Sequence, residues 1–366
     1  MEKLQVLEAD LARAINSAGI RLMKKISTLN INNLPISDYN RKYFMDIFGL
    51  HKPEGVKASI KHYIKRRILG HMYKYPDRYV IILGNLLRGK TLSDLQKMCF
   101  LDHGGGSGAL SLLAAELGYG RVYYNDIYEV SCDDSACIAK ALGHKSIIRI
   151  PGDIREIEDY CESNDITFDH AGSYDVIEHI YDIHGFIKRF PKICAQNSRV
   201  FFYSGANSYN PQIVQELSIA HDKIERVDRE YTPGWKNRDS LRAYSTIRAD
   251  IIKNHYLDLH LPEPEECTLD VLTEKTRGLM IYDIKNAIDT FLTDGTLPVP
   301  DTRFPSNTCD PMTGNWAEHL MDFEQLLSTV NDTFDICYLY PAEEHLSKAR
   351  AVGIYAERTS RAEKSV

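Results

Sequence analysis

The sequence lacks any apolar run long enough to cross a bilayer, which takes roughly 20 residues. Its longest apolar stretches, such as residues 79–83, are far shorter. The first residues, 1–5, also lack the basic segment and the apolar block of a secretory signal. We therefore expect a cytoplasmic protein without a membrane partner.

Clustered cysteines are missing as well. The chain has eight cysteines, but they are scattered and none forms a Cys-x-x-Cys pair. Such spacing is typical of reduced thiols and does not match the spacing of metal ligands. We expect neither a disulfide framework nor a metal site.

An excess of basic residues is absent too. The 44 Lys and Arg residues are outnumbered by 51 Asp and Glu residues, which gives a formal net charge of −7. Because nucleic-acid binding draws most of its affinity from clustered Lys and Arg, we expect no nucleic-acid partner. The basic segment 57–67 is more typical of a solvated helix face than of a phosphate contact.

The composition that is present is that of a folded globular protein. Hydrophobic residues make up 43% and charged residues 26% of the 366 residues. This length allows two domains, or one large domain with an insertion.

Residues 1–95 have a helical pattern. Apolar residues recur at helical spacing from Leu4 to Ile15, and Gly19 is a plausible end of the first helix. Pro53 and Pro76 interrupt the pattern, so we expect several helices joined by turns rather than one long rod.

From Lys97 onward, short β-prone runs alternate with helical segments. The runs are residues 98–101, 122–124, 147–150, 166–168 and 200–203. This alternation predicts an α/β fold with a parallel sheet and helices on both of its faces.

Two later runs, residues 334–340 and 351–356, are typical of strands that return to the sheet. The expected domains are therefore an N-terminal helical region (1–95), a Rossmann-like domain (96–206 and 332–358), a largely helical insertion (207–331) and a charged tail (359–366).

A glycine-rich loop follows the first expected strand. The strand ends in Asp102, glycines follow at positions 104, 106 and 108, and a compact helix spans residues 109–117. Glycines allow a tight turn and let a ligand approach the backbone, and the helix start offers free amide donors. Taken alone, such a loop also fits a turn without a ligand.

An acidic residue, Asp126, ends the second expected strand. A carboxylate there can accept hydrogen bonds from both hydroxyls of a ribose. Nicotinamide-binding and adenosylmethionine-binding proteins share this feature, so a nicotinamide-dependent oxidoreductase stays an alternative. A noncatalytic binding protein on the same fold is a second one.

Four segments carry a family resemblance. In chain order they are residues 101–108, 125–127, 152–154 and 168–180. Together they resemble the class I S-adenosyl-L-methionine-dependent methyltransferases, in particular the small-molecule branch that is similar to ubiquinone-biosynthesis O-methyltransferases. Dinucleotide dehydrogenases do not usually carry the Glu178-His179 segment. The resemblance covers about a third of the chain and implies a Rossmann-like class I methyltransferase sheet.

The resemblance also implies S-adenosyl-L-methionine as the cofactor and S-adenosyl-L-homocysteine as its product. The residues that it places around this cofactor are Asp102, His103, Gly104, Gly106, Gly108, Asp126, Ile127, Asp153, Ile154, Ser173 and Tyr174.

Methyl transfer is an in-line displacement, so the protein must hold the acceptor atom and exclude water. If the acceptor is a hydroxyl or a protonated amine, a nearby base helps, and we favour oxygen or nitrogen over carbon. His179 is the leading candidate for the base, and Tyr174 is expected beside the methyl group. The alternatives are that Glu178-His179 orients the next helix and that Tyr174 only forms a turn.

The acceptor is expected to be a small molecule bound partly by the insertion. The candidate contacts are Tyr209, Asn210, Trp235, Arg238 and Trp316. Their segments combine aromatic area with guanidinium groups that could hold a carboxylate or phosphate, although each also fits an ordinary turn or helix cap. A homodimer is compatible with this organisation.

Overall fold

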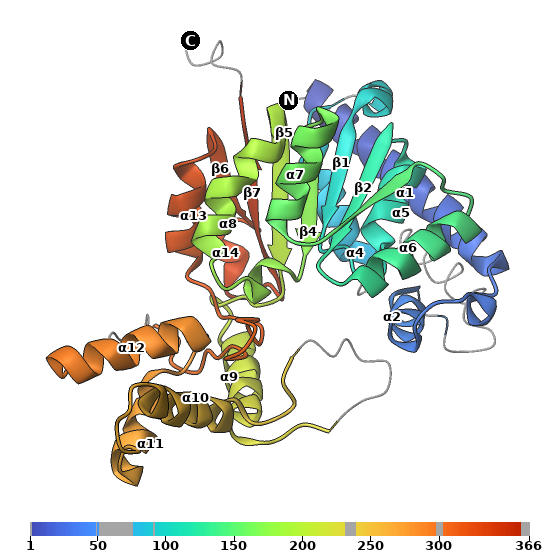
Figure 1. The fold of residues 1–366 in the computed structure, drawn as a ribbon. Coiled ribbons are helices and arrows are strands. Elements are labelled where there is room, and N and C mark those ends of the chain that lie inside the picture. Colours follow the sequence, from blue (N-terminus) through green and yellow to red (C-terminus); the bar gives the residue numbers. More distant parts are fainter. Residues whose placement is uncertain are drawn as a thin grey trace.

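The computed structural model describes residues 2–48, 50, 76–90, 92–230, 239–297 and 303–359 (Figure 1). The basic segment 57–67 and two of the predicted acceptor contacts, Trp235 and Arg238, lie outside the described residues.

A seven-stranded sheet forms the centre of the described chain, in the order β3-β2-β1-β4-β5-β7-β6. Its strands are β1 (Cys99–His103), β2 (Arg121–Asp126), β3 (Ile147–Pro151), β4 (Phe168–Tyr174), β5 (Cys194–Ser204), β6 (Ile336–Tyr340) and β7 (Val352–Glu357). Strands β1 to β5 pair in parallel, whereas β7 is antiparallel to both of its neighbours. The predicted Rossmann-like α/β fold is confirmed.

Helices cover both faces of the sheet. One face packs against α1 (Glu2–Thr28), α4 (Pro76–Leu86), α5 (Ala109–Leu117) and α6 (Glu129–Ala141), and the other against α7 (Ile154–Asn164), α8 (Ile183–Arg189) and α13 (Phe323–Asn331). The shorter elements are η1 (Ile31–Asn33), α2 (Asp38–Phe48), η2 (Leu92–Lys97), η3 (Ile177–His179), η4 (Phe190–Ile193) and α14 (Glu343–Leu346). Two apolar cores thus sandwich the sheet.

Helix α1 does not end at Gly19, so the predicted stop is wrong. The helix continues to Thr28, and Ala18, Leu22 and Ile26 are buried against the rest of the core. A glycine inside a helix costs up to about 1 kcal/mol relative to alanine. Burial of the apolar side chains on both sides of Gly19 outweighs that cost.

Strand β4 lies later than the run 166–168 that we expected. It spans Phe168–Tyr174, with small residues at its centre. A Cβ on Gly172 would lie 2.6 Å from Ile82 of α4, so the helix packs directly on the strand backbone. Because close packing selects small residues here, the strand lacks the β-branched composition by which strands are recognised.

Four helices of the insertion form a separate lobe beyond the carboxyl edge of the sheet (Figure 1). They are α9 (Pro211–Arg226), α10 (Tyr244–Asp258), α11 (Glu266–Lys275) and α12 (Ile281–Asp294). The lobe has a small apolar core of its own, which includes Tyr244, Ile252 and Leu272. Helix α13, in the range assigned to the insertion, instead packs on the sheet.

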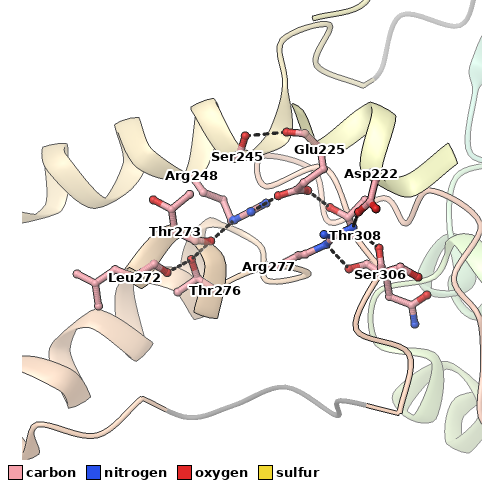
Figure 2. A network of polar contacts seen from close by, with 11 residues as sticks. Asp222, Glu225, Ser245, Arg248, Leu272, Thr273, Thr276, Arg277, Ser306 and Thr308 are labelled. Carbon is pink, nitrogen blue, oxygen red and sulfur yellow. Dashed lines mark hydrogen bonds and ion pairs between the residues drawn. The ribbon is translucent and has the colours of Figure 1, made fainter. Parts of the chain in front are cut away.

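A buried polar network holds the lobe together (Figure 2). The carboxylate of Glu225 in α9 accepts from Arg248 of α10 and from the Thr308 hydroxyl, the latter at 2.6 Å. Nε of Arg248 also donates to the Thr273 carbonyl in α11 at 3.1 Å. The side chains of Arg248 and Glu225 are 0% and 1% exposed. The ion pair and the hydrogen bonds around it thus join α9, α10 and α11 to the segment 303–322, which leads back to the sheet.

Candidate functional site

The glycine loop makes the tight turn that its sequence predicts. Gly104, Gly106 and Gly108 have φ values of 66°, 54° and 76°. A Cβ on Gly104 would collide with the side chain of Val176, in the segment that follows β4. The loop therefore lies directly against the carboxyl end of β4, and only glycine fits at this contact.

Asp102, the residue before the loop, fixes the start of α5. Its Oδ2 accepts from the backbone N–H and the hydroxyl of Ser111, at 2.9 and 2.7 Å. Burial raises the pKa of this carboxyl to about 7. The Asp102 side chain thus supports the loop by binding the first turn of α5.

Asp126 lies beside the loop at the end of β2, as predicted. Its carboxylate is 4% exposed and accepts from the N–H groups of Gly106 at 3.0 Å and Tyr128 at 2.9 Å. Two amide donors hold it in one orientation, next to the backbone that a cofactor would approach.

Helix α2 covers this corner of the site. Asp134 of α6 anchors the start of α2, because its carboxylate accepts from the Ser37 hydroxyl at 2.5 Å and from the Asn40 amide at 2.7 Å. The ring of Tyr43 then lies 3.2 Å from where a Cβ on Gly106 would be. Burial and the charge of Asp126 both raise the pKa of Tyr39, which stacks on Tyr43 at a centroid distance of 6.2 Å.

His103 points away from the loop into the core. Its Nδ1 lies 2.8 Å from Oδ1 of Asn125, and its ring stacks on Phe186 at 5.1 Å. Burial lowers the pKa of His103 to about 4, so the ring is neutral near pH 7. The amide of Asn125 donates to the carbonyls of Ile150 and Gly152. This pair joins the ends of β1, β2 and β3.

Of the remaining predicted cofactor contacts on this edge, Ile127 and Asp153 lie at the surface and Ile154 lies in the apolar core. Ile127 is 46% exposed at the end of β2. Asp153 caps α7, accepting from the Arg155 N–H at 2.7 Å in a capping box with Glu156. Ile154 is buried in the core beneath. Ile127 and Asp153 therefore border the edge, whereas Ile154 supports it.

Three buried hydroxyl groups line the loop and β4 without a hydrogen-bond partner among the residues that the structure describes. They belong to Ser107, Ser173 and Tyr174. Buried polar atoms are nearly always paired in folded proteins, so these hydroxyls are available for a hydrogen bond to a ligand or to water. Two of the three, Ser173 and Tyr174, were predicted as cofactor contacts.

The turn after β4 is held by charged groups. Asp175 has a φ of 51°, and its carboxylate accepts from the Gly205 N–H at 2.7 Å and from Arg78 of α4 at 3.3 Å. The guanidinium of Arg78 also lies over the ring of Tyr174, 4.5 Å from its centroid. The ends of β4 and β5 are thereby joined to α4.

Three carboxyl groups face this turn: Asp175, Glu178 and Glu318. Glu178 is 1% exposed, and its Oε2 has no hydrogen-bond partner within the described part of the chain. Burial, followed by the charge of Asp175, raises the pKa of Glu178 well above its usual range. Burial likewise raises the pKa values of Asp175 and Glu318. Burial and mutual repulsion thus favour the protonated forms of these carboxyl groups.

His179 is oriented by the insertion. Its Nδ1 lies 2.7 Å from the carbonyl oxygen of Trp316, and the Trp316 N–H donates to the His179 carbonyl at 3.3 Å. A proton on Nδ1 is the arrangement that satisfies this carbonyl, which leaves Nε2 as the nitrogen that can accept a proton. The predicted base and the predicted acceptor contact Trp316 are thus brought together.

The other predicted acceptor contacts have structural partners. Tyr209 stacks on Phe323 at 6.2 Å. Asn210 caps α9 by accepting from Gln212, and its amide donates to the Ala349 carbonyl at 2.9 Å. For Asn210 the structure favours the helix-cap alternative.

The sequence did not point to four residues that the fold brings to the site: Tyr43, Arg78, Glu318 and Tyr39. They come from the N-terminal helices and from the insertion, in segments without a recognisable motif. Glu318 has a φ of 55°, unusual for a side-chain-bearing residue, but only the structure shows this.

Within the described residues, no group of three or more His, Cys, Asp or Glu side chains could hold a metal ion. No helix in the described part of the chain has the length and apolarity that a membrane span requires.

No protein-family model and no curated protein sequence matches the chain. Solved structures that share part of its fold include a protein from Streptococcus mutans described as a SAM-dependent methyltransferase, at 15% identity and a TM-score of 0.28 over 36% of this chain and 38% of that chain. SMU.776, described as a methyltransferase complexed with SAH, is 15% identical, with a TM-score of 0.27 over 34% of this chain and 37% of that chain. The CurJ carbon methyltransferase is 11% identical, with a TM-score of 0.39 over 77% of this chain and 54% of that chain. Each match thus spans less than two thirds of the other protein.

Proposed function

We propose that this chain is an S-adenosylmethionine-dependent methyltransferase that acts on a small-molecule acceptor. The observation that carries the proposal is the carboxylate of Asp126, which is buried beside the glycine loop and accepts from the Gly106 N–H at 3.0 Å. S-adenosylmethionine carries positive charges on its sulfonium and ammonium groups, so a carboxylate beside the loop favours it. A dinucleotide would instead bring two negatively charged phosphates to the same loop.

The residues present fit this cofactor. Four of the five residues of the loop 104–108 are glycines, Asp126 suits the ribose hydroxyls, and the hydroxyls of Ser107, Ser173 and Tyr174, unpartnered within the described residues, offer hydrogen bonds to polar groups. Tyr43 covers the loop. When bound, S-adenosylmethionine supplies a methyl group on a sulfonium that a nucleophile can displace in line.

The chain's own residues then act on the acceptor. His179 holds its Nδ1 proton on the Trp316 carbonyl at 2.7 Å, so its Nε2 would take a proton from an acceptor hydroxyl or amine. The buried Oε2 of Glu178, which has no hydrogen-bond partner within the described part of the chain, would form a hydrogen bond with the same acceptor. Segment 316–319 of the insertion is joined to η3 by backbone hydrogen bonds from Trp316 and His319, and would help to exclude water from this position.

The sheet order disfavours the oxidoreductase alternative. Dinucleotide-binding dehydrogenases have six parallel strands in the order 3-2-1-4-5-6. Here an antiparallel β7 lies between β5 and β6. A noncatalytic role would not account for the buried Oε2 of Glu178, which has no hydrogen-bond partner within the described residues. The net charge of −7 favours a small molecule over a nucleic acid as the acceptor.

The test is transfer of a labelled methyl group from S-adenosylmethionine to a fraction of small metabolites. We expect labelled products from the wild type, and a loss of at least 100-fold in rate for His179→Gln, which keeps the cofactor residues intact. Oxidation of NADH without methyl transfer, or label found only in nucleic acid, would count against the proposal.

A further inference from the structure

A cavity of about 400 Å³ lies at the carboxyl edge of the sheet, between α4, the end of β5 and the connection from β6 to β7. Its walls include Arg78, Tyr203, Tyr340 and Arg350. The volume is within the range of small-molecule pockets, roughly 300–1,000 Å³.

The charged side chains in the lining are two guanidinium groups, those of Arg78 and Arg350. Each is paired with a carboxylate that is not part of the lining, Asp175 and Glu216. The side chain of Arg350 is 60% exposed and contacts Glu216 through Nη2 at 3.4 Å. A guanidinium has five N–H donors in a planar fork, so a contact through Nη2 leaves donors on the other two nitrogens for an anionic ligand.

The same walls offer aromatic surface. Tyr203 and Tyr340 lie 6.3 Å apart with their rings at 68°, an edge-to-face arrangement that a third ring can extend. Ala349, another lining residue, is held in place because the amides of Asn207 and Asn210 both donate to its carbonyl, at 2.8 and 2.9 Å. The pocket is thus a built site in which charge and aromatic rings occur together.

The cavity adjoins the candidate methyl-transfer site. Arg78 lines the cavity and contacts Asp175 at 3.3 Å. The next residue, Val176, packs against Gly104 of the glycine loop. A ligand in the cavity would therefore have its other end near the turn after β4, where His179 and Glu178 lie.

We propose that this cavity binds the anionic aromatic part of the acceptor, with Arg350 and Arg78 on its acidic group and Tyr203 and Tyr340 on its ring. That this ligand is the methyl acceptor rests on the proposed function. That the cavity binds an aromatic anion does not rest on it, since such binding requires no cofactor. A carboxylate and a phosphate would satisfy the same guanidinium groups.

The experiment is calorimetric titration of the full chain, without cofactor, with benzoate, cinnamate, 1-naphthoate and phenyl phosphate, each beside its neutral methyl or dimethyl ester. At least one anion is expected to bind at least tenfold more tightly than its ester, and comparison of the carboxylates with phenyl phosphate identifies the acidic group. In Arg350→Gln the affinity for that anion should fall about tenfold. The matched control Arg242→Gln, an exposed arginine of the lobe paired with Asp250, should leave it unchanged.

A second variant tests whether the aromatic ring of the ligand contacts Tyr340. Tyr340→Ala should weaken the anion and its ester by the same factor, because both lose the aromatic contact. The proposal is overturned if no anion binds, if anion and ester bind equally, or if Arg350→Gln leaves affinity unchanged. If the chain binds the anion but not S-adenosylmethionine, the cavity assignment stands and the proposed methyltransferase function is wrong. Failure of the cavity proposal and failure of the proposed function are therefore distinguishable.

Discussion

Gly106 lies under the ring of Tyr43, and its φ of 54° is one that side-chain-bearing residues rarely adopt. Gly143 offers a matched comparison, because its φ is 82° but a Cβ there would meet nothing within 4 Å. Alanine at either position should cost about 1–2 kcal/mol in the free energy of unfolding. Only Gly106→Ala should also weaken S-adenosylmethionine binding, by tenfold or more, in calorimetric titrations. Equal cofactor affinity in the two variants would show that the loop does not meet the cofactor.

Asp102 makes the stability of the fold depend on pH. Burial raises its pKa from 3.8 to about 7, so the folded chain binds this proton more tightly than the unfolded chain does. The stability contributed in this way is complete below pH 3.8 and is lost as the pH rises to about 7.

The variant Asp102→Asn removes this titration. The difference in unfolding free energy, variant minus wild type, should rise by about 1.4 kcal/mol per pH unit between pH 4 and 7 and then level off. Urea denaturation at a series of pH values measures it, with the exposed carboxyl replaced in Asp258→Asn as a control for the lost charge. A difference that stays constant with pH would contradict the raised pKa.

The residues that the sequence identified are those whose role follows from their own strand or loop. Asp126 and the loop glycines were predictable because the ends of neighbouring parallel strands meet at one edge. Tyr43 and Arg78 were not, because their place depends on how α2 and α4 pack on the sheet. His103 was assigned to the cofactor from its position in the motif, yet its ring lies among Phe186 and Phe190.

Among the structural elements, the lobe contains a buried ion pair, between Arg248 and Glu225. Removing Arg248 in Arg248→Met leaves Glu225 buried, with Thr308 as its remaining partner from this network. Breaking a buried ion pair in this way should cost about 3–5 kcal/mol in unfolding free energy. The exposed pair of Lys285 and Asp258, also in the lobe, provides a control, and Lys285→Met should cost at most about 1 kcal/mol. Similar small losses in the two variants, measured by chemical denaturation, would refute a structural role for the network.

The elements differ in how far their sequence revealed them. Helix α5 was predicted with its observed bounds, 109–117, because Gly118 ends it in the left-handed conformation. Strand β4 was misplaced because contact with α4 requires small residues there. Helix α1 was predicted too short, since periodicity cannot show that burial on both sides of Gly19 outweighs the cost of glycine.

On the scale of the whole molecule, the sheet and the lobe meet at one edge. The glycine loop, the turn after β4 and the segment 316–319 all lie there, and the helices α9–α12 extend beyond it (Figure 1). The sequence predicted that an insertion precedes the last two strands. Its contact with η3 could not be predicted, because residues 178 and 319 are far apart in the chain and come together only through the fold.

This arrangement predicts that cofactor binding stabilises the folded chain as a whole. S-adenosylhomocysteine at 100 times its dissociation constant should add about 2.7 kcal/mol to the unfolding free energy. Chemical denaturation with and without the ligand measures this difference, and NADH at the same concentration should add none. Stabilisation by NADH alone would favour the oxidoreductase alternative.

The most direct test of the account is calorimetric titration of the full chain and of Asp126→Asn with S-adenosylmethionine. We predict saturable binding to the wild type with one site per chain. The variant should bind roughly 10 to 100 times more weakly, the effect of losing hydrogen bonds to a charged group worth about 1.5–3 kcal/mol. Absence of saturable binding to the wild type, or equal affinity in the variant, would contradict the assignment of the glycine loop and Asp126 as the cofactor site.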